Sequence, residues 1–453
     1  MLALLMLMVC CVNAHAHDAD AKHLTEHGLL ESLLVTIDDS DEYIIKTLHY
    51  SYRNNRFVSL RDLAYSLRGM SKQFNVTVEQ NRVKILTGAE YTPVGGEGIP
   101  FPDIDSTTGD YYVYKTYDLM VNPIELDGRE LKYQSFMSTG SDGYVDCFIS
   151  LTDVAMQLDL AIKFSGQGVA LDTMGSCIID LDALEDEGFY YKIHTALVGD
   201  ASTGEVYAAW YPELSVPIAS TTKLMTYLVI KDALANKNIS ADDLITVPQE
   251  AAELSRTEDG VIILDEGMEA PLDELMAAML LASSNECALT LAVHVAGSEE
   301  AFVDLMKNKA DELGLSEEVR FYDCHGLPIY TNNLAATKVQ NRMSAQDMFK
   351  LVRHILSVYP EITILTAQKV ATLEVLGVTV TNTNPLLYNV PGVIGLKTGT
   401  TNMAGDCLVV AMEAIDSEGQ THFLIAIQFG AEDETIRATL SEELIRYAKQ
   451  QLY

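Results

Sequence analysis

Apolar and polar positions follow two different patterns along the chain, and the change falls near residue 190. Beyond that point, Thr195–Asp200 and the run that begins at Glu205 are short and largely apolar, and Ser202-Thr-Gly separates them. Two β-like runs on either side of a glycine-containing turn predict a hairpin.

Longer elements follow this hairpin. Helical periodicity and continuous apolar runs predict helices at 272–281, 301–313 and 434–452, and buried strands at 407–412 and 423–429. A hairpin, a helical middle section, strands and a final helix together predict an α+β fold, in which helices flank an antiparallel sheet.

The region before residue 190 contains an internal repeat. Phe57-Val-Ser-Leu-Arg-Asp-Leu-Ala is echoed by Phe148-Ile-Ser-Leu-Thr-Asp-Val-Ala, and β-like runs follow each copy. Ser59 and Ser150 stand where a helix N-cap is expected. We therefore predict two copies of a unit made of a short strand, a helix and one or two strands.

Two stretches have the composition of connecting segments. Residues 88–110 are rich in Gly, Pro, Asp and Thr, and Asp180–Gly188 is acidic and turn-prone. We therefore predict an N-terminal α+β repeat module at 30–173 and a second domain at 186–453.

Composition narrows the possible partners. The chain has 453 residues, 48% of them hydrophobic, and a formal net charge of −35 at pH 7, so it is globular and strongly acidic. Such a charge repels nucleic acid and anionic lipid, and neither is expected as a partner.

The first residues predict export. An apolar run from Met1 to Val12 ends at Ala14-His15-Ala16, which is similar to a signal peptide with its cleavage site, although the usual basic start is missing. The run is too short for a membrane span. We predict a signal peptide at 1–16 and an extracellular or cell-envelope location.

The cysteines and histidines predict neither a disulfide framework nor a metal site. After residue 16 the cysteines are odd in number and scattered, so buried free thiols are expected at Cys147, Cys177, Cys287, Cys324 and Cys407. The ten histidines show no metal-ligand spacing. Cys287 and His325 lie near the motifs described next, and we assign them packing roles.

Three motifs in the larger domain carry the candidate chemistry. The first is Ser220-Thr-Thr-Lys223, in which Ser and Lys at i and i+3 share one helix face. Ser220 is the predicted nucleophile and Lys223 its general base, because serine needs a base at neutral pH. Lysine serves only when its neutral form is populated, which burial or nearby positive charge favours, and Lys397 is a candidate for that charge.

The second motif is Ser283-Ser-Asn285, which follows the apolar helix. We expect it in a loop that faces the nucleophile. Ser283 is predicted to relay a proton between the Lys223 amine and the leaving group. Asn285 has both donor and acceptor atoms, which suit a substrate amide and the fixing of Lys223.

The third motif is Lys397-Thr398-Gly399-Thr400, at the end of a predicted strand. Its glycine permits close approach of a substrate, which can lie against the strand as an added strand. The backbone N–H groups of Thr400 and Ser220 are the expected oxyanion pair. Lys397, Thr398 and Thr400 are predicted to bind a terminal carboxylate.

Each motif alone has an ordinary explanation: a capped surface helix, a turn between helices, or a strand with an exposed lysine. Together and in this order they form the set found in penicillin-binding proteins and class A β-lactamases. The chain from about residue 190 to 453 resembles the serine-type D-alanyl-D-alanine carboxypeptidases, the low-molecular-mass penicillin-binding proteins. Leu281-Ala-Ser-Ser-Asn-Glu-Cys-Ala and the segment Lys397–Leu408 also look family-like, although Glu286 stands where Asp is frequent.

This resemblance implies a penicillin-binding/β-lactamase-like transpeptidase fold without a cofactor. It implies removal of the terminal D-alanine of peptidoglycan stem peptides through an acyl-Ser220 intermediate that water hydrolyses. β-Lactams would act as covalent inhibitors that mimic the substrate.

The N-terminal repeats resemble copper amine oxidase N-terminal-like domains through their F-(V/I)-S-L-x-D-x-A phrases. The resemblance implies a stalk or wall-contacting module, and no copper ligand cluster is visible.

Three alternatives stay open. One is a class A-like β-lactamase, whose rapid deacylation uses a Glu-x-x-Leu-Asn loop; no Leu-Asn dipeptide occurs here. The second is a DD-endopeptidase that cleaves cross-links. The third is a catalytically silent cell-wall-binding protein, which labelling by a fluorescent penicillin would distinguish from the others.

Overall fold

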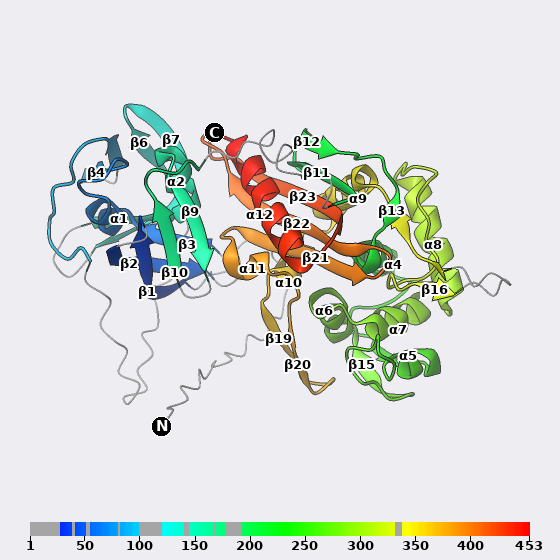
Figure 1. Ribbon diagram of the computed structural model, residues 1–453. Helices are drawn as coiled ribbons and strands as arrows, with labels where there is room; N and C mark the ends of the chain where they lie inside the picture. The colour runs from blue at the N-terminus through cyan, green and yellow to red at the C-terminus, as the bar shows by residue number, and fades with distance from the viewer. Residues whose placement is uncertain are drawn as a thin grey trace, which may run out of the picture.

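The structure, a computed structural model, describes residues 28–38, 41–50, 55–79, 82–98, 120–139, 145–165, 168–177, 193–330 and 338–453. An N-terminal module (blue to cyan) lies beside a larger unit (green to red), as Figure 1 shows. The predicted signal peptide and the predicted boundary at 180–188 lie outside the described residues.

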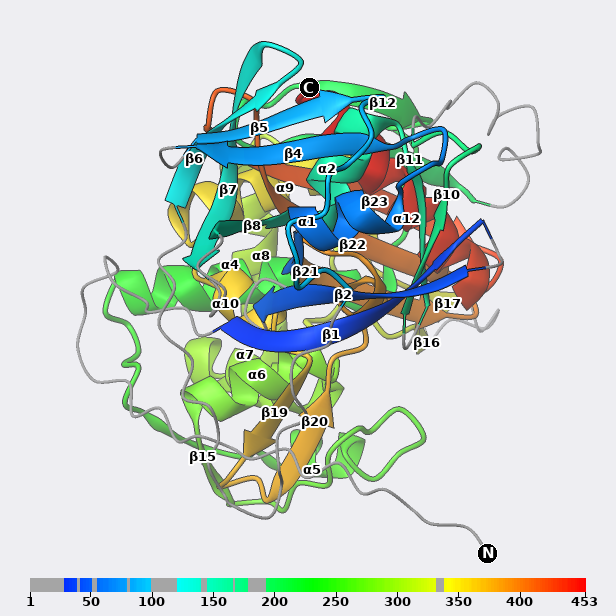
Figure 2. The same ribbon diagram turned by 90° about the vertical axis from the view of Figure 1, so that its left-hand side faces the viewer.

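The N-terminal module is built on a ten-stranded sheet with the order β4-β5-β6-β7-β8-β3-β2-β1-β10-β9 (Figure 2). Two helices, α1 (Leu60–Ser66) and α2 (Leu151–Leu158), share one apolar core with the strands. The strands are β1 (Gly28–Ile37), β2 (Asp41–Tyr50), β3 (Asn55–Ser59), β4 (Phe74–Glu79), β5 (Arg82–Thr87), β6 (Met120–Leu126), β7 (Arg129–Thr139), β8 (Val145–Ser150), β9 (Ala161–Ser165) and β10 (Gly168–Asp172).

The sequence repeat is also a structural repeat. Each copy runs hairpin, strand, helix, hairpin, with β3 and β8 carrying the repeated phrases and pairing antiparallel in the middle of the sheet. The last hairpin of each copy pairs with the first strand of the other copy, β5 with β6 and β10 with β1. Exchanging the copies leaves the strand order unchanged. The module is therefore an intertwined two-fold unit, and neither copy forms a contiguous sheet by itself.

The predicted strand–helix–strand unit is confirmed in both copies. Ser59 caps α1 by accepting a hydrogen bond from the Asp62 N–H at 3.0 Å, whereas Ser150 holds the N-cap position without a side-chain bond. The hairpins β1-β2 and β6-β7 were not predicted. Residues 88–98, expected as a loop, contain no helix or strand, and this loop is fastened by the Tyr91 hydroxyl donating to Glu97 at 2.8 Å.

The larger unit is centred on a five-stranded sheet in which every neighbouring pair is antiparallel. In order across the sheet, its strands are β12 (Val206–Trp210), β11 (Thr195–Asp200), β23 (Thr421–Ala431), β22 (Gly405–Ile415) and β21 (Val393–Thr401). The predicted hairpin is β11-β12. The third motif lies on β21, which is an edge strand.

Helices cover both faces of this sheet. Successive residues of β22 alternate between two cores: Leu408 and Val410 pack with the terminal helix α12, while Val409 and Ala411 pack with the helical section. Burial on both faces explains why β22 and β23 read as continuous apolar runs. The predicted antiparallel sheet flanked by helices is confirmed.

The remaining elements form the helical section and its short hairpins. The helices are α4 (Lys223–Ala235), α5 (Gln249–Leu254), α6 (Leu272–Leu281), α7 (Asn285–Ala296), α8 (Glu299–Glu312), α9 (Ala345–Val358), α10 (Ile362–Thr366), α11 (Leu386–Asn389) and α12 (Glu434–Gln450). The short paired strands are β13 (Val216–Pro217) with β18 (Arg342–Met343), β14 (Leu244–Thr246) with β15 (Glu269–Pro271), β16 (Ile329–Tyr330) with β17 (Lys338–Val339), and β19 (Val370–Leu373) with β20 (Val378–Thr381).

The end of the chain joins the two units. Lys449 near the end of α12 forms a buried ion pair of 2.6 Å with Asp153 of α2, and the Tyr453 hydroxyl donates to the same carboxylate at 2.7 Å. Asp153 is the repeat counterpart of Asp62, which is paired with Lys46 of its own copy at 2.9 Å. In the first copy the lysine that pairs with the aspartate comes from the same copy. In the second copy it comes from the larger unit, as Lys449.

Five cysteines, Cys147, Cys177, Cys287, Cys324 and Cys407, are buried free thiols as predicted. Within the described ranges, no helix has the length and apolarity that a bilayer crossing requires. The same ranges contain no group of three or more His, Cys, Asp or Glu residues placed to hold a metal ion.

Candidate active site

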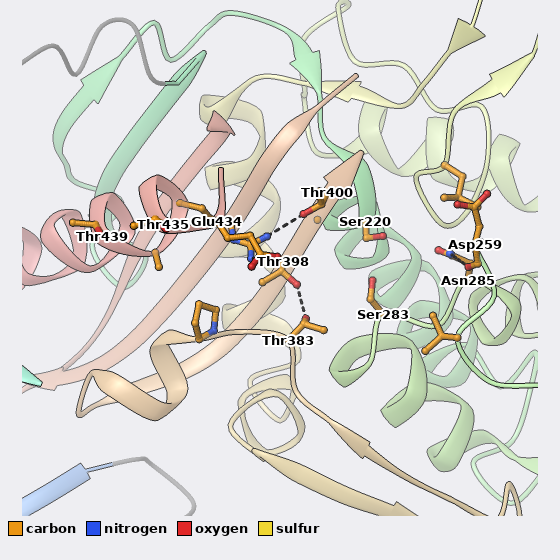
Figure 3. A pocket seen from close by; sticks show the side chains of 16 residues that line it. Ser220, Asp259, Ser283, Asn285, Thr383, Thr398, Thr400, Glu434, Thr435 and Thr439 are labelled. Atoms are coloured by element: carbon orange, nitrogen blue, oxygen red, sulfur yellow. Dashed lines mark hydrogen bonds and ion pairs between the residues drawn. The ribbon is translucent and has the colours of Figure 1, made fainter. Parts of the chain in front are cut away.

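A cleft of about 790 Å³ lies between β21 and the helical section, and residues from all three motifs line it. Thr398 and Thr400 stand on the β21 wall, Asp259 and Asn285 form the opposite wall, and Ser220 lies between them (Figure 3). The first turn of α12 closes one side with Glu434 and its neighbours. The structure thus brings together three motifs that lie far apart in the sequence.

Ser220 and Lys223 meet at the junction of two helical types. Ser220 lies in a 3₁₀ turn, Ala219–Thr222, and Lys223 is the first residue of α4. Side chains at i and i+3 eclipse in a 3₁₀ turn. The Lys223 Nζ accordingly lies 2.9 Å from the Ser220 Oγ, as the spacing predicts.

The Lys223 amine has three hydrogen-bonding neighbours: the Ser220 hydroxyl, the Asn285 side chain and the His325 carbonyl. Its Nζ donates to the Asn285 Oδ1 at 2.7 Å and to the His325 carbonyl at 2.9 Å. The Asn285 Nδ2 donates to the Asp259 carbonyl at 2.7 Å, which fixes the orientation of that amide. Two acceptors thus take two amine protons, so a neutral Lys223 directs its lone pair at the Ser220 hydroxyl.

Burial also adjusts the charge of this amine. The Lys223 side chain is fully buried, and that burial lowers its pKa to about 8, although the nearby Cys324 and Asp323 oppose the shift. Burial, the first of the two causes considered from sequence, is therefore the largest cause of the lowered pKa.

The three residues of the second motif, Ser283, Ser284 and Asn285, have different structural roles. Ser283 lines the cleft in a left-handed conformation, with φ of 63°, and its hydroxyl points toward Ser220 in Figure 3. Ser284 is the N-cap of α7 and accepts from the Cys287 N–H at 3.1 Å. Asn285 begins α7, so it stands on a helix and not in the loop that we predicted. A left-handed non-glycine residue at such a place is a mark of a functional site.

Glu286 has a supporting role that the sequence did not reveal. Its buried carboxylate accepts from the Val261 N–H at 3.1 Å and from the Ile262 N–H. These bonds hold the loop that presents the Asp259 carbonyl to Asn285. The replacement of the frequent Asp by Glu therefore retains an acceptor for this wall of the cleft.

The third motif contacts the nucleophile through its glycine. A Cβ at Gly399 would lie 2.8 Å from the Ser220 backbone nitrogen and 3.0 Å from the Ala219 Cβ. Such distances are not tolerated, so only glycine lets β21 approach the turn that carries the nucleophile. This close approach brings β21 and Ser220 together at the cleft.

The other residues of this motif already have partners. Lys397 is buried and its Nζ donates to the Thr398 carbonyl at 2.9 Å; burial, with the charge of Lys223 second, lowers its pKa well below the usual value. Thr398 and Thr383 share a hydroxyl hydrogen bond of 2.5 Å. The Thr400 hydroxyl donates to Asp406 at 2.5 Å.

Several supporting residues carry no motif and were missed. His325 contributes its carbonyl, while its ring is buried, consistent with the packing role that we assigned. Gly326 packs under the nucleophile, since a Cβ there would lie 2.0 Å from the Ala219 oxygen. The Asn341 carbonyl accepts from the Ile218 N–H at 3.1 Å. Such contacts join distant segments, and of these residues the sequence had drawn attention only to His325, through its place near the motifs.

The fold and the cleft together define a class: an α+β protein with a serine–lysine pair beside an edge strand, as in penicillin-binding proteins. The chain belongs to the D-alanyl-D-alanine carboxypeptidase family, whose model matches residues 189–432.

Individual relatives agree with this assignment. The chain is 30% identical over 255 residues to D-alanyl-D-alanine carboxypeptidase DacD of Escherichia coli, covering 55% of this chain and 61% of that one. It is 32% identical over 257 residues to the D-alanyl-D-alanine endopeptidase of Pseudomonas aeruginosa, covering 54% and 78%. Among solved structures, a peptidoglycan synthesis regulatory factor (PBP3) from Streptococcus pneumoniae matches with a TM-score of 0.52 at 28% identity, covering 57% and 73%.

The family match concerns the larger unit. The chain spans about three fifths of the length of the carboxypeptidase relatives that come first. The family match begins at residue 189, after the described part of the N-terminal module.

Proposed function

We propose that this protein is an exported serine-type D-Ala-D-Ala carboxypeptidase that removes the terminal D-alanine of peptidoglycan stem peptides. The observation that carries the proposal is the arrangement around Lys223, whose amine is buried, has a lowered pKa and directs its free position at the Ser220 hydroxyl. Family membership supports the same reaction.

The proposed steps conserve protons and charge. Lys223 takes the Ser220 proton while the oxygen attacks the penultimate D-alanine carbonyl, and the backbone N–H groups of Ser220 and Thr400 stabilise the oxyanion. Ser283 passes the proton from Lys223 to the departing D-alanine amine, which leaves an acyl-Ser220 ester. Water then attacks the ester with Lys223 as base, and the serine is regenerated. Asn285 binds the substrate amide beside the Lys397 strand.

Covalent labelling by a fluorescent penicillin tests this proposal. The wild-type chain should be labelled, and Ser220→Ala should abolish labelling because the acyl acceptor is gone. Ser357→Ala is a matched control, since this serine lies on α9 in a different cleft and should be labelled like the wild type. Labelling of a folded Ser220→Ala protein, or none of the wild type, would remove the assignment.

Endopeptidase action on cross-links is the second candidate. Relatives named D-alanyl-D-alanine endopeptidase are matched over a larger share of their own length, 78% and 84%, than the carboxypeptidase DacD at 61%. Comparing turnover of a monomeric pentapeptide and of a cross-linked dimer separates the two activities. The penicillin label distinguishes both from the two remaining functions: a β-lactamase would release the label rapidly, and a silent wall-binding protein would never acquire it.

We further propose that the N-terminal module at 30–173 is a non-catalytic stalk that contacts the cell wall and that 186–453 is the catalytic domain. A chain of residues 186–453 should fold and be acylated by penicillin at the full-length rate, because every proposed site residue lies within it. It should melt at a lower temperature, since Lys449 and Tyr453 lose Asp153; each kcal/mol lost lowers Tm by about 2–4 °C in a domain of this size.

Intact cell walls should reveal the contribution of the stalk. The shortened chain should be slower on them than the full chain while the two match on a soluble peptide. A shortened chain that folds but is not acylated would mean that the module shapes the active site, and the stalk role would be wrong.

A further inference from the structure

A buried ion pair lies beside the proposed substrate strand and has no part in the serine–lysine chemistry. Arg437 near the start of α12 donates from Nη1 to the Asp406 Oδ1 at 2.9 Å and to the Thr400 hydroxyl at 3.0 Å. The Thr400 hydroxyl in turn donates to the same Asp406 oxygen. Arg437 and Asp406 are 6% and 7% exposed, so these three groups form one compact network.

This network faces the cleft. Arg437 and Thr400 both line it, and Thr400 stands on the β21 wall in Figure 3. The Arg437 Nε is buried and has no hydrogen-bond partner among the described residues. Asp406 therefore holds the Arg437 guanidinium in place, while the Nε–H of that guanidinium donates no hydrogen bond to a described residue.

The charged side chains on this wall of the cleft carry no net positive charge. Among the described residues that line the cleft, Arg437 is the cation; Asp406 compensates it directly, and Glu434 adds a second, exposed carboxylate 3.7 Å from the Arg437 Nη2. Lys397 is buried and does not line the cleft, and burial lowers its pKa well below the usual value, which disfavours its charged form. A free carboxylate that enters beside Thr400 thus meets a compensated arginine and an anion that already occupies the threonine hydroxyl.

We propose that Asp406 is a specificity-determining residue that lowers the preference of the cleft for leaving groups with a free carboxylate. A leaving group with a neutral terminus, such as an amidated D-alanine, has no charge that Asp406 could repel. Its turnover relative to that of the free acid is therefore higher than it would be without Asp406. The inference rests on the proposed function, because it assumes that the leaving group of an acyl-D-Ala substrate lies beside Thr400. Like charges across a close contact discriminate between ligands even where they contribute little to affinity.

Substrate pairs that differ only at the terminus test this role. We would measure kcat/KM of the full chain for a soluble acyl-D-Ala-D-Ala peptide and for its C-terminal amide. Asp406→Asn keeps the shape and the acceptor oxygen but removes the charge, so the ratio of acid to amide should rise at least about tenfold, the size of effect that one close charge pair supplies. The ratio of the acylation rates with benzylpenicillin and with its methyl ester measures the same preference for a free carboxylate, and it requires no turnover.

Two further variants make the result decisive. Glu432→Gln removes an equal charge from an exposed residue outside the cleft and should keep the wild-type ratio. Adding Arg437→Gln to Asp406→Asn should cancel the gain, because the released arginine is the group that would receive the carboxylate. An acid-to-amide ratio that stays unchanged in a folded Asp406→Asn protein overturns the inference while penicillin labelling leaves the proposed function intact. Absence of labelling in the wild type would instead reject the proposed function, and this inference with it.

Discussion

Replacing Lys223 with alanine is expected to slow acylation of Ser220 by penicillin by ~10²–10⁴-fold, the usual contribution of a general base. The variant removes the only side-chain nitrogen that contacts the Ser220 Oγ among the described residues. Asn285 and the His325 carbonyl would then have no amine to hold. The measurement is the second-order rate constant for acylation, with a melting curve to show that the variant folds.

The pH dependence of the wild type provides an independent check. The neutral form of Lys223 is the base, and burial sets its pKa to about 8, so acylation should accelerate as pH rises through about 8 and then level off. His325 does not produce this rise, because burial lowers its pKa to about 4. A rate that is flat from about pH 6 to 9, on either side of that pKa, or a Lys223→Ala variant that retains the same profile, would argue against the assignment.

Gly399→Ala is expected to cause the second large loss, a drop in acylation of about 100-fold, as displacement of a reacting group by about 1 Å can produce. The added Cβ would lie 2.8 Å from the Ser220 nitrogen and 3.0 Å from the Thr221 nitrogen. Both atoms belong to the turn that carries the nucleophile, so the strand and the turn must separate. The oxyanion pair that we propose would be disrupted with them.

A distant glycine serves as the control for this variant. Gly377 lies in the turn between β19 and β20, with φ of 68°, and a Cβ added there would have no atom within 4 Å. Gly377→Ala therefore adds backbone strain without crowding, and it should lower Tm slightly while acylation stays at the wild-type rate. If Gly399→Ala were acylated as fast as Gly377→Ala, close approach of β21 would not be needed for the reaction.

Local patterns determined much of the larger unit. The apolar run 272–281 coincides with α6, and the spacing of Ser220 and Lys223 alone predicted their contact. These features depend on neighbours in sequence, through helical periodicity or a turn of fixed geometry, so they can be read without the fold. The two F-(V/I)-S-L-x-D-x-A phrases likewise located α1 and α2 in the N-terminal module.

Pairing between distant segments could not be read in this way. The sequence showed two repeats in the N-terminal module but not that each copy donates its last hairpin to the other, because strand partners are chosen by the whole sheet. The first hairpin of each copy was missed as well. The roles of Glu286 and Asn341 depend on loops that other segments bring close to them.

The sequence by itself therefore determined the family, the order of the motifs and the identity of the proposed nucleophile and base. Only the tertiary structure decided which groups surround them. Burial is the largest cause that lowers the pKa of Lys223, and Thr400 is already bonded to Asp406 and Arg437. The physical reason is that desolvation and ion pairing depend on three-dimensional distance, and residues such as Asp406 and Arg437 are brought together only when the sheet and α12 pack.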